Sequence, residues 1–337
     1  MRTLLLRCCC LGMLGGLLPG GHGQEVFNYL RAGQPPALEI MSLGRGLYIA
    51  RGDWGANIGF FVGDDGVLVI DAKATEQGTR KVIKEIDRIA GKPIKKVIVT
   101  HSDSDCVNGY QAYPKNADLI MSQKAWEEMA AGSATYLEMN APSEIYVFKP
   151  EFRRKPTLTF DGRLRIWFGS ETIELLHYGQ AHTSGDAIVI FPDREVAFIG
   201  DLVFGDRDPL IQDRKGGYSF GLVRVLSILL NEMPAIQEFV PSHSIPLRRD
   251  QIQSYLRSIE AVQSRVIDSV GQGKSLEDVI RAFGVQDAPQ RLGNWAWPSF
   301  PVVIYRELSQ NRDLAHAMML KNIAGKIAPL LLNAIRY

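Results

Sequence analysis

Short polar motifs follow directly after apolar runs at several points in this 337-residue chain. The apolar run at 96–100 leads into the segment HSDSDC (101–106), and a second such segment, AHTSGD, occupies 181–186. Asp201 and His243 also stand just past apolar runs. A short, continuous apolar run is typical of a buried β-strand. Because borderline metals such as zinc accept imidazole, carboxylate and thiolate ligands together, these strand ends predict a function that centres on a bound metal.

Strands and helices alternate along the chain. Apolar and alternating patterns predict strands at 47–51, 57–62, 67–70, 96–100, 157–160, 164–167, 172–177, 187–191 and 196–199. Helical periodicity predicts helices at 77–90, from about 105 to before Pro114, and at 125–131, 251–270, 276–283 and 314–335. The turn residues Asp161-Gly162 predict a hairpin, and 295–298 is expected to be a loop. Each half of the chain contains several predicted strands and ends in predicted helices. This order predicts two sheets packed face to face, with the helices on the outside.

The composition limits the classes of partner. With 46% hydrophobic and 22% charged residues, the chain has enough apolar material for a large core in a soluble protein. The net charge is +1, and the sequence has neither a basic stripe nor a charged tail. We therefore expect a small-molecule substrate rather than a nucleic acid partner.

The first 23 residues are typical of an export signal. Arg2 supplies a positive start, and the stretch 4–18 is largely apolar although Arg7 interrupts it. Gly21 and Gly23 place small residues where signal peptidase cleaves. A membrane anchor is the alternative, but the apolar stretch is short for a span. Cleavage would leave a periplasmic or secreted protein without a stable membrane anchor, in which Cys106 is unpaired and no intrachain disulfide can form.

The segment 101–106 resembles a known family motif. Its pattern H-x-D-x-D-C stands where the metallo-β-lactamase superfamily carries H-x-H-x-D-H, directly after a strand that ends in Val-Thr. Further features follow in the family's order, namely VLVID (67–71), GQAHTSGD (179–186), FIGD (198–201) and VPSHS (240–244). The resemblance implies an α/β (α+β) fold of the four-layer αββα type. It suggests a metallo-β-lactamase-like domain at 24–250 and a C-terminal helical extension at 251–337 packed on the same domain.

The resemblance also implies a set of metal ligands. One metal would be held by His101, Asp103 and His182, and a second by Asp105, Cys106 and His243. Asp201 would bridge the two metals, and Asp71 would act from behind them by fixing the ligand loop. The expected cofactor is one or two zinc ions, with iron as an alternative. Asp105 is the candidate catalytic residue, and a metal-bound hydroxide would be the nucleophile.

Two positions depart from the family motif. Asp103 and Cys106 stand where the family has histidines. With Asp105, Asp201 and a Cys106 thiolate, the site would carry four negative charges, which cancel two divalent ions outright. Such a site depresses the pKa of bound water less than the usual motif does. We therefore expect either weaker catalysis or a preference for a more highly charged or softer metal.

Each candidate ligand also has a purely structural interpretation. His101 and His182 could be buried core histidines, and Asp103 could cap a helix. Cys106 could be a small buried hydrophobe. Asp201 after a glycine could be a turn residue, and His243 could be an ordinary loop histidine.

A few other residues invite a role in the site. Asn57, Lys73 and Lys215 could contact substrate, whereas His177 closes an alternating strand and is more typical of a structural histidine. The tryptophans at 295 and 297 favour packing against the last helix over a binding platform.

Three functions are consistent with the sequence. The first is an exported metal-dependent hydrolase that acts on an ester, thioester, lactone or amide. The second is a metallo-β-lactamase proper, which the altered motif and the long C-terminal extension disfavour. The third is a degenerate, metal-binding member without catalysis. Fold alone does not choose among them.

Overall fold

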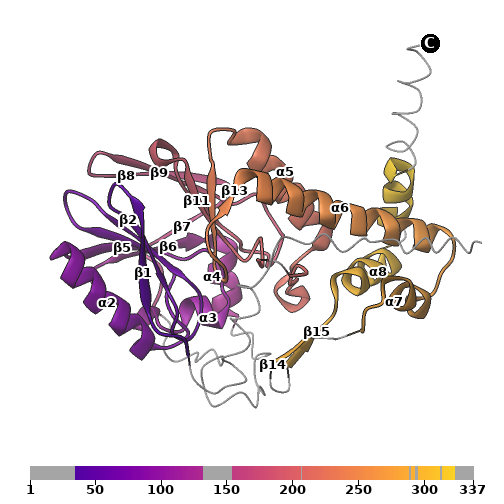
Figure 1. The fold of residues 1–337 in the computed structure, drawn as a ribbon, viewed down its shortest axis with the longest axis horizontal. Helices are drawn as coiled ribbons and strands as arrows, with labels where there is room; N and C mark the ends of the chain where they lie inside the picture. The colour runs from indigo at the N-terminus through magenta and orange to yellow at the C-terminus, as the bar shows by residue number, and fades with distance from the viewer. Residues whose placement is uncertain are drawn as a thin grey trace, which may run out of the picture.

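The computed structural model describes residues 35–131, 154–205, 207–287, 290–292, 295–311 and 313–322. The predicted export signal at 1–23 and most of the predicted helix at 314–335 lie outside these residues. Two large sheets form the centre of the molecule, with helices on the outer face of each (Figure 1). Within the described residues, no helix has the length and apolar character that crossing a membrane requires.

The first sheet contains seven strands in sequence order. They are β1 (Glu39–Gly44), β2 (Leu47–Arg51), β3 (Ile58–Val62), β4 (Val67–Ile70), β5 (Ile94–Ile98), β6 (Asp118–Ser122) and β7 (Leu158–Phe160). Strands β1 to β4 pair antiparallel, whereas β4 to β7 run parallel. The carboxyl ends of β4 and β5 therefore meet at one edge of the sheet.

The second sheet contains six strands in the order β13-β12-β11-β10-β9-β8. They are β8 (Arg163–Phe168), β9 (Glu171–Leu176), β10 (Ile188–Phe191), β11 (Val196–Gly200), β12 (Glu238–Pro241) and β13 (Leu247–Arg248). Strands β11 and β12 are parallel, so their carboxyl ends also share an edge. A separate two-stranded sheet joins β14 (Gln290–Leu292) to β15 (Trp295–Trp297).

Helices cover the outer face of each sheet. The labelled α-helices are α2 (Glu76–Ala90), α3 (Ser104–Val107), α4 (Gln123–Ala130), α5 (Ser219–Glu232), α6 (Arg249–Gly271), α7 (Leu276–Phe283) and α8 (Phe300–Gln310), and the described residues 313–322 are helical as well. Short 3₁₀ turns occur at η1 (Tyr110–Ala112), η4 (Pro192–Arg194) and η5 (Asp213–Lys215). Helices α2 and α4 pack on the first sheet, and α5, α6 and α8 pack on the side of the second (Figure 1).

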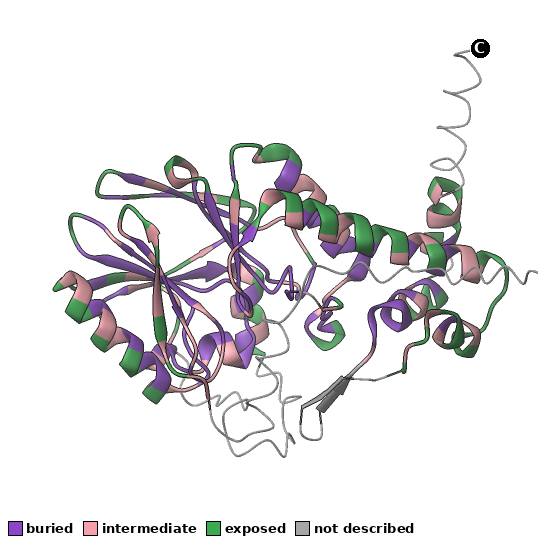
Figure 2. Ribbon diagram, viewed as in Figure 1, coloured by how far each residue is buried: buried purple, intermediate pink, exposed green. Residues whose placement is uncertain are grey.

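The continuous apolar runs in the strands reflect burial on both faces (Figure 2). In β4, Val67 and Val69 face the helices, whereas Leu68 and Ile70 belong to the core between the sheets. β10 repeats this arrangement, with Val189 and Phe191 in the core between the sheets. Successive side chains point to opposite faces of a strand, so a strand that is covered on both faces must be apolar throughout. The four-layer αββα sandwich predicted from the sequence is confirmed.

Three local predictions were wrong. Asp161-Gly162 does not close a hairpin, because β7 belongs to the first sheet and β8 to the second, so this turn carries the chain from one sheet to the other. The helix expected from about 105 is broken into α3 and η1. The expected loop at 295–298 contains strand β15.

The C-terminal helices contact the start of α5. The Glu307 carboxylate of α8 accepts hydrogen bonds from the Ser219 backbone N–H (2.9 Å) and hydroxyl (2.5 Å). The Gln263 side chain of α6 donates to the Ser219 carbonyl at 3.0 Å. Both helices therefore fix the point at which the chain leaves the 210–217 segment, which lies at the site described next.

Candidate metal centre

His101 follows β5, and a chain of hydrogen bonds sets its ring. The Thr100 backbone N–H and hydroxyl donate to the two carboxylate oxygens of Asp71, at 2.7 and 2.8 Å. Because the Thr100 hydroxyl proton is used in this way, its oxygen accepts from His101 Nδ1, which lies 2.9 Å away. Nδ1 must then carry the ring proton, so Nε2 keeps its lone pair for a ligand.

His182 is oriented in the same manner from the loop between β9 and β10. Its Nδ1 lies 2.8 Å from the carbonyl oxygen of Leu210, an atom that can only accept. Nδ1 therefore carries a proton in either charge state of the ring, and Nε2 is the nitrogen that a cation could bind. The two rings lie edge to face, with their centroids 5.1 Å apart.

Asp201 is shared by three histidines. Its Oδ2 lies 3.6 Å from His101 Nε2, 3.7 Å from His182 Nε2 and 3.6 Å from His243 Nε2. Its Oδ1 is buried and has no hydrogen-bond partner within the described residues. A buried carboxylate oxygen without a partner is costly in a finished core. Asp201 is thus placed as a bridging ligand would be.

Asp103 is enclosed by donors. Lys215 Nζ lies 2.7 Å from Oδ1, and the Gln212 side-chain amide donates to Oδ2 at 2.9 Å. His182 Nε2 lies 3.1 Å from the same Oδ2. Burial acts to raise the pKa of Asp103, but Lys215 and His182 outweigh it and hold that pKa well below its usual range. Asp103 is the N-cap residue of α3, but its side chain makes no capping hydrogen bond.

His243 and Asp105 form the more open part of the cluster. His243 Nε2 lies 2.9 Å from Asp105 Oδ2, and the two side chains are 10% and 15% exposed. The Asn57 side-chain amide holds the loop of His243 by donating to the carbonyls of Pro241 (2.9 Å) and Ser244 (2.8 Å). Asn57 therefore positions this loop from behind, through the backbone.

Cys106 lies at the back of the cluster. Its Sγ is 3.6 Å from His101 Nε2, and its side chain is fully buried among apolar residues that include Val107. Burial raises the pKa of the thiol well above its usual value, although His101 acts in the opposite direction. The sulfur is close to the other candidate ligands and is also part of the core, so both interpretations of Cys106 are compatible with its position.

The donor atoms fit a small, tightly coordinated cation. One group of four ligand atoms, from His101, Asp103, His182 and Asp201, lies within 4.8 Å of one another. Tetrahedral zinc with bonds of about 2.0–2.2 Å separates neighbouring ligand atoms by roughly 3.3–3.6 Å. The distances of 3.6 to 3.7 Å from Asp201 Oδ2 to the three histidine nitrogens are close to that spacing, whereas the pairs His182–Asp103 (3.1 Å) and His243–Asp105 (2.9 Å) are at hydrogen-bond distance. Together with the unpartnered oxygen of Asp201, this spacing shows that the residues present suit a metal ion.

The mutual electrostatics of the cluster are strong. Burial acts to lower the pKa of His182, but the carboxylates of Asp103 and Asp201 raise it to about 9. Burial raises the pKa of Asp71 to about 6, against the opposing effect of His101. The pKa of Asp201 is lowered, because His243 and the other two histidines outweigh its burial. A bound cation would supply the positive charge that the histidine protons supply to these carboxylates in its absence.

The chain matches the family model of the metallo-beta-lactamase superfamily over residues 51–263. It belongs to the metallo-β-lactamase superfamily. One curated relative is "Metallo-beta-lactamase type 2" from Elizabethkingia meningoseptica, which is 25% identical over 150 residues, covering 44% of this chain and 53% of that protein. The chain therefore spans about half the length of that relative.

Solved structures share the fold. A metallo-beta-lactamase from Pontibacter korlensis is 16% identical, with a TM-score of 0.55 over 66% of this chain and 99% of that one. The stereoselective inverting sec-alkylsulfatase Pisa1 from Pseudomonas sp. is 14% identical, with a TM-score of 0.59 over 80% of this chain and 50% of that one. At these identities, the likeness concerns the superfamily fold alone.

Other residues singled out in the sequence have different positions. Lys73 is fully buried, and its Nζ donates to the carbonyls of Ala50 (3.3 Å) and Ala56 (2.6 Å), so it supports the backbone rather than facing substrate. Lys215 is likewise buried against Asp103. His177 is outside the cluster, with Nδ1 2.8 Å from the Asp186 carbonyl. The side chains of 295 and 297 lie outside the described residues.

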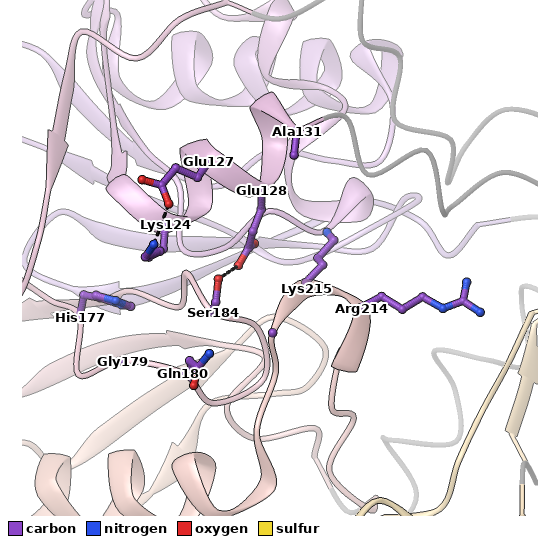
Figure 3. Close-up of a pocket in the computed structure, with 11 residues that line it drawn as sticks. Lys124, Glu127, Glu128, Ala131, His177, Gly179, Gln180, Ser184, Arg214 and Lys215 are labelled. Atoms are coloured by element: carbon purple, nitrogen blue, oxygen red, sulfur yellow. Dashed lines mark hydrogen bonds and ion pairs between the residues drawn. The ribbon is translucent and has the colours of Figure 1, made fainter. Parts of the chain in front are cut away.

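A pocket of about 510 Å³ lies beside the ligand loops (Figure 3). Glu128 of α4 lines it and accepts hydrogen bonds from the hydroxyls of Ser102, which precedes Asp103, and Ser184, which lies two residues after His182. Lys215 also borders this pocket. The roles of Glu128 and Gln212 could not be predicted from the sequence, because neither residue belongs to a motif.

Proposed function

We propose that this protein is a metal-dependent hydrolase that acts on an ester, thioester, lactone or amide. The observation that carries this proposal is the position of Asp201, whose carboxylate lies within 3.7 Å of three imidazole nitrogens while its second oxygen has no hydrogen-bond partner among the described residues. Side chains from four loops thus converge on one point. Membership of a superfamily that includes metallohydrolases supports the same reading.

The proposed ligands are those that the motif indicates. His101, Asp103 and His182 would hold one metal ion, and Asp105 and His243 a second, with Asp201 between them and Cys106 as a further candidate. Zinc is the preferred ion because it accepts these ligand types, with iron as the alternative. A bound divalent metal would lower the pKa of water and polarise a substrate carbonyl.

The residues of the chain supply orientation and proton transfer. Asp71 acts through Thr100 to keep the proton of His101 on Nδ1, and the Leu210 carbonyl does the same for His182. Asp105 is the more exposed carboxylate of the cluster, and His243 orients it at 2.9 Å. We propose that Asp105 accepts a proton during hydrolysis, because a general base must be reachable from the substrate side.

A β-lactam is the second candidate substrate, because the E. meningoseptica relative carries the name of a β-lactamase. A sulfate ester should be tested as a substrate as well, because a similar structure is named as an alkylsulfatase. A degenerate, non-catalytic member is the remaining alternative.

The test is a substrate panel with zinc-loaded protein. It would contain a chromogenic cephalosporin, a secondary alkyl sulfate, and activated esters, thioesters, lactones and amides. We expect turnover of at least one of the last four classes, and its loss in Asp105→Asn and after chelation. Turnover of the cephalosporin alone would replace the proposal with the β-lactamase. Zinc-loaded protein that turns over none of these compounds would support the non-catalytic alternative.

We also propose that the protein is exported and that the leader is removed. The charged and then apolar start of the chain supports this. Mass analysis of exported protein should show a loss of about 23 residues. An intact or lipidated N-terminus would contradict the proposal.

A further inference from the structure

Asp103 is unusual because it stands where the superfamily motif has a neutral histidine. A buried carboxylate needs a compensating charge, since burial without a partner is costly. Here Lys215 supplies it: its Nζ lies 2.7 Å from Asp103 Oδ1 and donates to the Ser102 carbonyl at 2.8 Å. The two side chains are only 3% and 7% exposed, so water screens the pair little.

We propose that Lys215 neutralises the charge of Asp103. The pair then has no net charge, like the neutral histidine that the superfamily motif carries at this position. The inference rests on the metal site of the proposed function and does not depend on which substrate is hydrolysed. Lys215 is a positioning residue, because it acts through Asp103.

The pair changes the charge expected from the sequence. With Cys106 left out of the count, the carboxylates of Asp103, Asp105 and Asp201 and the Lys215 ammonium leave a net charge of −2. The ordinary motif with its bridging aspartate carries the same charge, from two aspartates. The electrostatic penalty expected from Asp103 is therefore removed, and the site keeps the positive excess that lowers the pKa of water.

The segment that carries Lys215 orients two ligands at once. The Leu210 carbonyl fixes His182, and the Gln212 side chain donates to Asp103 Oδ2. Backbone hydrogen bonds bind the same segment to the His182 loop, from Gln212 N to the His182 carbonyl (2.8 Å) and from Ser184 N to the Lys215 carbonyl (2.8 Å). The Lys215 ammonium therefore has a fixed position relative to both His182 and Asp103.

The test is a double-mutant cycle with the variants Lys215→Met, Asp103→His and the two together. The readouts are the thermal midpoint of the metal-free protein and the zinc dissociation constant from competition with a chromophoric chelator. Lys124→Met is the matched control, because Lys124 borders the same pocket but pairs on the surface with Glu127.

The proposal predicts that the two single substitutions change the charge at the metal site in opposite directions and that these changes cancel in the double variant. Lys215→Met should lower the midpoint of the metal-free protein and increase the rise that zinc produces, because the buried Asp103 carboxylate loses its ammonium partner. Asp103→His should weaken zinc binding by roughly tenfold or more, because an unpaired ammonium then faces the metal. The double variant should bind zinc within about threefold of wild type, and Lys124→Met should match wild type.

Two results would overturn the proposal: losses of zinc affinity that simply add in the double variant, or a Lys215→Met midpoint equal to wild type. If Lys215→Met does not fold, Asp103→Asn with Lys215→Met carries neither charge and should fold; its failure would also overturn the proposal. A wild-type protein without zinc affinity would refute the proposed function, whereas the midpoints would still test the ion pair.

Discussion

The two halves of the metal cluster differ in how much of the protein encloses them. On the Asp103 half, His182 and Asp103 are 0% and 7% exposed, and Lys215 and Gln212 fix the carboxylate. On the Asp105 half, His243 and Asp105 are 10% and 15% exposed, and Asn57 holds the loop of His243 through backbone carbonyls. The same kinds of ligand thus have very different surroundings.

This difference suggests a division of work within one site. An enclosed ligand that is bound on both oxygens keeps its geometry and gives a metal a fixed place. A partly exposed carboxylate can meet a substrate and exchange a proton with it. We infer that the Asp103 half holds the centre together, whereas the Asp105 half is where substrate arrives.

The largest effect should come from Asp201, because it belongs to both halves. Asp201→Asn removes the shared charge and should weaken zinc binding by more than about a hundredfold, since even indirect supports of a ligand are worth about ten- to hundredfold. Hydrolysis should fall with metal content, as measured by elemental analysis and by turnover. The exposed Asp213→Asn, on the neighbouring segment, should leave both unchanged.

Removing the Asp103 carboxylate from one half and the Asp105 carboxylate from the other should affect stability and hydrolysis differently. Asp103→Ala strands the buried ammonium of Lys215 and should lower the stability of the metal-free protein by about 3–5 kcal/mol. Asp105→Ala should cost about 1 kcal/mol or less, because its pair with His243 is more exposed, yet it should abolish most of the hydrolysis. Urea unfolding and turnover measure the two effects. Equal losses of stability would break the distinction between the halves.

The pH dependence of the metal-free protein should reveal the enclosed half. The pKa of His182 is about 9 in the native state, because Asp103 and Asp201 outweigh its burial, and is about 6.5 when the chain is unfolded. The native state therefore binds the extra proton between these values. The stabilisation is complete below about pH 6.5 and is lost as the pH rises through 9.

Zinc should remove this dependence, because a ligand imidazole must be neutral. Denaturant unfolding from pH 6 to 9, with and without zinc, measures it, and His182→Gln should flatten the metal-free curve. A metal-free protein whose stability is constant over this range would contradict the proposed charge state of His182.

The smallest effect should come from Asn57, which acts on the open half through the backbone. Asn57→Ala removes two hydrogen bonds to the loop of His243 and should cost about 1–2 kcal/mol of stability. Turnover should fall by up to about tenfold, while zinc remains bound at the Asp103 half. The exposed Asn116→Ala serves as the control in both assays.

The sequence predicted those parts of the fold that depend on local patterns. The run that became β4 is apolar throughout because both of its faces are covered. Helix α5 was missed because it is apolar on most sides and lies buried, so its sequence has little amphipathic period. The turn at Asp161-Gly162 was assigned to a hairpin because turn chemistry does not tell whether the flanking strands pair with each other or diverge.

The candidate ligands could be read from motifs, but their partners could not. Lys215 lies 112 residues from Asp103 in sequence, and no local pattern connects the two. The expected excess of negative charge at the site followed from the motif alone, and a distant lysine offsets the charge of Asp103. Asn57 and Lys73 were expected near substrate, whereas both support the backbone, because side-chain direction depends on packing that the sequence does not display.

The central claim is that this cluster binds a metal, and elemental analysis of the purified wild-type protein tests it most directly. The account predicts one to two metal ions per chain, zinc above all, in protein prepared without chelator. It also predicts that Asp201→Asn prepared in parallel carries less than half of that amount. Wild-type protein that holds no stoichiometric metal, even after incubation with zinc, would contradict the account.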